Sequence, residues 1–122
     1  MDSAYKIDNN VLYNEHGDIQ CIPARANLQQ LVCSRNVSMV PSFAFSYCKN
    51  IKSVSFEYCI LLDNSFENCD NLNYVIINDG TTNISANAFV NCPYLKICSY
   101  KDSEAKIYAM AHGIPFIEIP EE

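Results

Sequence analysis

The chain has 122 residues, of which 49% are hydrophobic, and a formal net charge of −6. This composition predicts a single domain, residues 1–122, with a modest core, and its eight scattered Lys and Arg residues argue against a nucleic-acid partner, because phosphate binding needs clustered positive charge. No apolar run approaches the ~18 residues that span a membrane. The first twenty residues are also too polar for a signal peptide, so we expect no membrane insertion and a cytoplasmic location.

The first predicted element is a hairpin between Tyr5 and Ile22. Its strands are residues 11–13 and 18–22, and the turn formers at 14–17 join them. Pro23 ends the second strand because it cannot donate to a sheet. Residues 1–27 are therefore expected to form an N-terminal hairpin cap.

Residues 28–101 contain an internal repeat. One phrase with Phe, Cys and a final Ile or Leu occurs at 45–51, 66–72 and 89–95, and the same frame extends back to Leu28. The steps between the Phe residues are 21 (45 to 66) and 23 (66 to 89). Periods of this size are typical of solenoids, in which each unit stacks on its neighbours.

Each repeat unit is predicted to combine a short strand with a short helical turn. The strand pieces 51–56 and 72–77 alternate in hydrophobicity, and 95–100 is placed in the same frame with Cys98 facing inward. Residues 40–48 carry apolar side chains at i, i+4, i+5 and i+8, which suits a helical turn with Phe45 facing inward. The expected fold is a strand-dominated α/β repeat solenoid with short helical turns.

The seven cysteines raise the alternatives of a metal site and of disulfides. Cys48, Cys69 and Cys92 occupy equivalent repeat positions and are predicted to form a column of buried thiols. There is no C-x-x-C pair, and the odd count favours reduced thiols in a reducing compartment. Neither His16 nor His112 lies near a nucleophile motif, and no Gly-rich phosphate loop exists. We therefore expect no enzyme activity, metal or cofactor.

Residues 102–122 are predicted to form a C-terminal helix cap. Ser103 can cap a helix that runs to about His112, Gly113 can close it, and 114–117 form a last extended piece. One face of this helix would cover the open end of the stack, and its residues are Ala105, Tyr108, Ala109 and His112.

The phrase A-F-x-x-C-x-x-[LI]-x-x-[VI]-x-[IF] resembles the leucine-rich repeats of the BspA-like family. Ala44-Phe45 and Ala88-Phe89 carry the Ala-Phe pair, whereas Ser65-Phe66 departs from it, and 103–116 looks like the C-terminal cap of that family. The likeness covers about residues 28–119. It implies a right-handed, curved leucine-rich-repeat solenoid that binds proteins. Members in bacteria and parasitic protists are often surface proteins implicated in adhesion to host cells.

The binding site is expected on the concave strand face, where residues interleaved with the inward pairs point outward and vary from unit to unit. These residues are Gln30, Val32, Ser53, Ser55, Glu57, Tyr74, Ile76, Asn78, Ile97, Ser99 and Lys101. Tyr74, Ile76 and Ile97 would form an apolar group with a polar rim, which is typical of a modest protein-binding patch. The alternative, that a short solenoid merely leaves some apolar residues outside, stays open.

Two classes of function fit these observations. The first is a non-catalytic module that binds a protein ligand of unknown identity and that is adhesion-related by resemblance. The second is a structural or self-associating repeat fragment of a longer surface adhesin, because exposed strand edges favour assembly. Such a fragment would lie at the cell surface.

Overall fold

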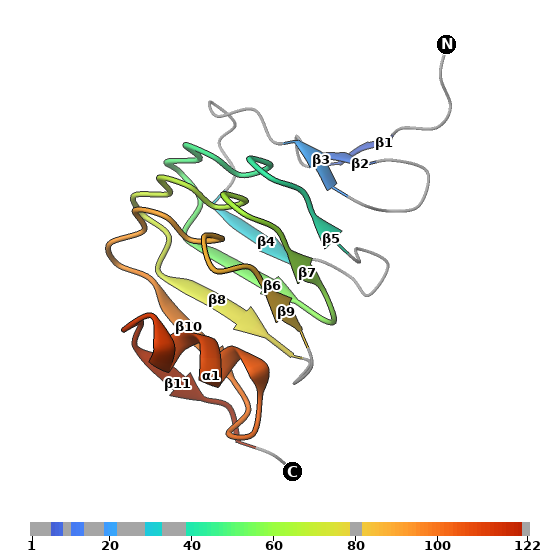
Figure 1. Ribbon diagram of the computed structural model, residues 1–122. Helices are drawn as coiled ribbons and strands as arrows, with labels where there is room; N and C mark the ends of the chain where they lie inside the picture. The colour runs from blue at the N-terminus through green and yellow to red at the C-terminus, as the bar shows by residue number, and fades with distance from the viewer. Residues whose placement is uncertain are drawn as a thin grey trace.

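The computed structural model describes residues 6–8, 11–13, 19–21, 29–32, 39–78 and 82–120. Short strands dominate them, and one short helix lies near the C-terminus (Figure 1). The elements are β1 (Lys6–Asp8), β2 (Val11–Tyr13), β3 (Ile19–Cys21), β4 (Gln30–Val32), β5 (Met39–Val40), β6 (Ser53–Phe56), β7 (Ile60–Leu61), β8 (Tyr74–Ile77), β9 (Asn83–Ile84), β10 (Lys96–Ser99), α1 (Glu104–Ala111) and β11 (Phe116–Glu118).

Two parallel sheets run along the stack. The five-stranded sheet has the order β11-β10-β8-β6-β4, and the three-stranded sheet has the order β5-β7-β9. Successive repeat units add one strand to each sheet, so the chain winds as a β-solenoid (Figure 1). This arrangement is the stacking that the repeat period predicts.

The segments that link β5 to β6, β7 to β8 and β9 to β10 stack on one another through their backbones. We call residues 42–47, 63–68 and 86–91 the first, second and third rungs. In the first and second rungs, alternate N–H groups donate to the next rung, as from Phe45 N to Ser65 O at 2.8 Å and from Phe66 N to Ala88 O at 2.9 Å. The prediction of helical turns was wrong, because pairing with the next unit takes N–H groups that a helix would use internally.

Left-handed backbone recurs at matching places in the rungs. Asn68 and Asn91 have φ of 59° and 58°, and Tyr47 holds the equivalent place in the first rung with φ of 61°. Phe43 and Asn64 form a second such pair at 65° and 62°. Asn tolerates this region, whereas an aromatic residue there is strained.

A column of phenylalanine rings fills the interior, as predicted. Phe66 stacks on Phe45 with ring centroids 4.7 Å apart and on Phe89 with centroids 5.1 Å apart. The equivalent cysteines lie beside this column, since the Cys69 thiol donates to Phe45 O at 3.0 Å and the Cys92 thiol donates to Phe66 O at 2.9 Å. The repeat phrase therefore encodes the core of the stack.

The helix expected near the C-terminus is α1. Its N-cap is Ser103, whose hydroxyl accepts from the N–H of Lys106 at 3.1 Å, and Gly113 follows with φ of +68°. Ala105 and Ala109 are buried against the stack. After the helix, β11 joins the edge of the five-stranded sheet, parallel to β10.

The N-terminal strands form an antiparallel sheet of their own. β2 pairs with β3, as the hairpin prediction required, and β1 pairs with the other edge of β2, which the sequence analysis did not anticipate. The predicted turn at 14–17 and Pro23 lie outside the described residues. In Figure 1 this sheet lies at the opposite end of the molecule from α1.

Candidate functional site

The strand register defines which side chains share the outer face of the five-stranded sheet. Val54, Val75 and Ile97 occupy matching places in neighbouring strands and are all fully buried, so the residues between them point outward. One outward row consists of Gln30, Ser53, Tyr74 and Lys96. The other consists of Val32, Ser55, Ile76, Cys98 and Ile117.

The outer face presents large apolar groups beside a cation. Tyr74 is 41% exposed, and the Lys96 ammonium lies 5.5 Å from the centroid of its ring. Val32 and Ile117, at the two edges of the sheet, are 68% and 42% exposed. A cation over a tyrosine face is attracted by the ring quadrupole, which helps to hold the ring in place. The face therefore offers a positioned aromatic ring next to an apolar row.

Two residues of the predicted site lie inside the protein. Ile97 and Ser99 are fully buried, and the Ser99 hydroxyl donates to Ile77 O at 2.8 Å. Leu95 stands two residues before the inward Ile97, whereas Leu72 stands three residues before its counterpart Val75. Side chains in a strand alternate between the two faces of the sheet. The missing residue therefore moves every side chain of β10 to the face opposite the expected one. The frame placed on 95–100 was therefore wrong by one residue.

The correction puts three residues on the outer face that the sequence analysis missed. Lys96 and Cys98 take the outward places on β10, although Cys98 keeps only 7% of its surface exposed. Ile117 follows on β11, which had not been aligned with the repeats. The sequence could have indicated the outward position of Lys96, because a lysine between Leu95 and Ile97 is more readily accommodated on the exposed face.

The remaining members of the predicted site lie just beyond the strands. Glu57 follows β6, Asn78 follows β8, and Lys101 lies in the turn after β10. The Asn78 side-chain amide donates to Ser55 Oγ at 3.2 Å and to Phe56 O at 3.1 Å. These two bonds tie successive units together, so Asn78 has a structural part in the stack.

The cysteine column is not uniform. Cys48 and Cys69 are buried as predicted, but Cys92 is only half-buried, which contradicts its predicted burial. A hydrogen bond between the Cys69 and Cys92 side chains raises the pKa of Cys69 and lowers the pKa of Cys92. Burial also raises the pKa of Cys69. Burial alone raises the pKa of Cys48 to about 11. Among the described residues, no group of three or more His, Cys, Asp or Glu side chains could hold a metal ion.

The fold and its period define a leucine-rich-repeat type of protein, since stacked repeats of 20–29 residues that each add a strand to one parallel sheet belong to that class. The family model that matches is the BspA type leucine rich repeat region, in six copies over residues 21–113. The chain therefore belongs to the BspA-type leucine-rich-repeat family. No curated protein and no solved structure matches it. Within the described part of the chain, no helix is long and apolar enough to cross a membrane.

Proposed function

We propose that this protein is a non-catalytic interaction module that binds a protein ligand on the outer face of the five-stranded sheet. Membership of a leucine-rich-repeat family supports the general class, because such solenoids present extended binding surfaces. Parallel crossover connections are right-handed in about 98% of cases, so we expect a right-handed coil with this sheet on its concave side. The free thiols of the described cysteines would suit a reducing location.

The observation that carries the proposal is the exposed ring of Tyr74 with its two neighbours on this face. Ile76 lies two residues further along the same strand and is half-buried, and Lys96 flanks the ring. Aromatic anchors at the centre of a patch tend to dominate binding energy. Positions 53, 74 and 96 carry Ser, Tyr and Lys on one row, so this row varies while the core column keeps Phe.

The test compares two matched double variants. Tyr74→Ala with Ile76→Ser removes the centre of the outer face, and we expect it to weaken affinity for a captured partner at least about tenfold, ~1.4 kcal/mol. The control is Tyr58→Ala with Ile60→Ser, which removes the same two residue types at the same spacing around β7. Tyr58 is 40% exposed, so the two tyrosines match in exposure as well.

The measurement is calorimetric titration with whichever partner the intact protein captures, and thermal melts verify folding. The proposal requires the Tyr74 variant to lose affinity while the Tyr58 variant stays within about twofold of the original. Equal affinities for all three proteins would remove the site from the five-stranded sheet. A loss in the Tyr58 variant alone would move it to the three-stranded sheet.

A further inference from the structure

The third rung ends a hydrogen-bond ladder whose donors all point one way along the stack. The first rung donates from Phe43, Phe45 and Tyr47 to the second rung, and the second donates from Asn64, Phe66 and Asn68 to the third. The corresponding donors of the third rung are the N–H groups of Asn87, Phe89 and Asn91. No carbonyl among the described residues accepts from these three groups.

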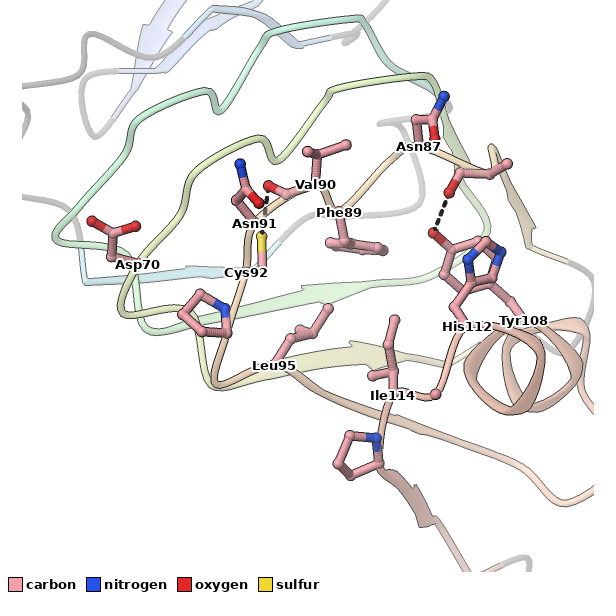
Figure 2. A pocket seen from close by; sticks show the side chains of 14 residues that line it. Asp70, Asn87, Phe89, Val90, Asn91, Cys92, Leu95, Tyr108, His112 and Ile114 are labelled. Carbon is pink, nitrogen blue, oxygen red and sulfur yellow. Dashed lines mark hydrogen bonds between the residues drawn. The ribbon is translucent and has the colours of Figure 1, made fainter.

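A cavity of about 670 Å³ lies where a fourth rung would continue the ladder. The third rung lines one side of it, and the segment from Tyr108 to Pro115 lines the other (Figure 2). Phe89, Leu95 and Ile114 supply an apolar floor (Figure 2). The helix α1 contacts the rung through Tyr108, which donates its hydroxyl to Ala86 O at 3.1 Å and packs its ring against that of Phe89. A volume of this size is in the range of binding pockets.

The chemistry of the cavity is specific to one kind of occupant. Three N–H groups on alternate residues of one edge complement the carbonyls of a peptide with the turned backbone of a rung, because elsewhere in this stack such groups donate to the carbonyls of the next rung. Asp70 lies at one end of the cavity, and its carboxylate is already paired with the Lys49 ammonium at 3.2 Å.

We propose that the third rung is a second binding site, which takes a peptide of a partner protein that adopts the turned backbone of a rung and lies parallel to it. The peptide carbonyls accept from Asn87, Phe89 and Asn91, so the ladder gains one more rung. The rings of Tyr108 and Phe89 already pack together, with centroids 6.2 Å apart, so they occupy part of the space beside the rung. The remaining space between Leu95 and Ile114 suits a medium-sized apolar side chain of the peptide. This site is separate from the outer face of the five-stranded sheet.

The probe is the peptide Ser-Ala-Asn-Ala-Val-Val-Asn-Ser-Lys, which follows residues 85–93 with Val, Ser and Lys in place of Phe89, Cys92 and Pro93. The third rung is the template because it already pairs with an edge of the same kind. Titration into the isotope-labelled full chain is followed by amide NMR and by hydrogen exchange. We expect binding on the order of 0.1–1 mM. Exchange should slow at least about tenfold at Asn87, Phe89 and Asn91, and should stay unchanged at Phe45 and Tyr47, which are already bonded.

Two controls distinguish backbone hydrogen bonding to the third rung from nonspecific association of the peptide. The mirror-image peptide has the same composition and charge but the opposite backbone handedness, so it cannot match the turned backbone of a rung and should give no protection. Val90→Trp should fill the cavity mouth and weaken binding at least about tenfold, whereas Glu67→Trp, at the equivalent place in the second rung, should leave it within about twofold.

Absence of protection at the three amides at saturating peptide overturns the proposal. Equal binding of the mirror-image peptide overturns it too, and so does equal affinity of the Val90 and Glu67 variants. If the Val90 variant fails to fold, the two peptides compared on the unaltered protein still decide the question. Shifts confined to Tyr74 and Ile76 would assign the peptide to the outer face and remove this site.

Discussion

The second and third rungs carry almost the same phrase but have different neighbours. Phe66 lies between two rungs and is fully buried, whereas Phe89 has the second rung on one side and the cavity on the other and is only half-buried. Cys69 and Cys92 differ in the same way. The same residue therefore contributes differently according to whether another unit follows it. Nearest-neighbour contacts, and not the phrase alone, determine stability in a repeat protein.

The largest expected difference concerns the two phenylalanines. Phe66→Ala removes a ring stacked on both faces and in edge contact with Phe56 at 6.1 Å, so we expect a loss of about 3–5 kcal/mol in the free energy of unfolding. Phe89→Ala should cost at least about 1 kcal/mol less, because its ring already borders the cavity and leaves a smaller buried void. Urea denaturation of both variants measures this, with the m-value reporting on two-state behaviour.

Equal losses for the two variants would mean that the third rung is as well covered as the second. A loss within error for Phe66→Ala would contradict the register of the whole stack.

The second expected difference concerns thiol reactivity. Alkylation requires the thiolate, and Cys92 combines a lowered pKa with partial exposure, whereas Cys69 is fully buried with a raised pKa. In the native protein we expect iodoacetamide to modify Cys92 at least about tenfold faster than Cys69 or Cys48, a difference of ~1.4 kcal/mol in the barrier. Peptide mapping by mass spectrometry assigns each site.

The control for this labelling is the same reaction in denaturant, where the three cysteines should react at similar rates. Native labelling of Cys69 ahead of Cys92 would contradict the described order of burial.

The predictability of this molecule from sequence differs between its inside and its outside. The Phe column follows from the repeat phrase because the same ring recurs at each core place. Which residues lie on the outer face depends on whether they occupy odd or even positions along a short strand. One missing residue after Leu95 therefore sufficed to misplace Ile97 and Ser99. Helical turns failed for another reason, since the apolar spacing at 40–48 fits a helix but the N–H groups bond to the next rung. Local pattern could not reveal that long-range pairing.

The smallest expected effect isolates the one departure from the Ala-Phe pair. Ser65 stands where the neighbouring rungs have Ala44 and Ala88, and its hydroxyl is buried without a hydrogen-bond partner among the described residues. A buried unsatisfied hydroxyl costs about 1–3 kcal/mol, so Ser65→Ala should stabilise the fold by about 1 kcal/mol and raise Tm by about 3–5 °C. Ser99→Ala is the matched control, because that buried hydroxyl does donate, to Ile77 O at 2.8 Å. It should lower stability by about 1 kcal/mol. Thermal melts of the two variants should therefore shift in opposite directions, and destabilisation by Ser65→Ala would mean that its hydroxyl is bonded and that the alanine of the other rungs is not its equivalent.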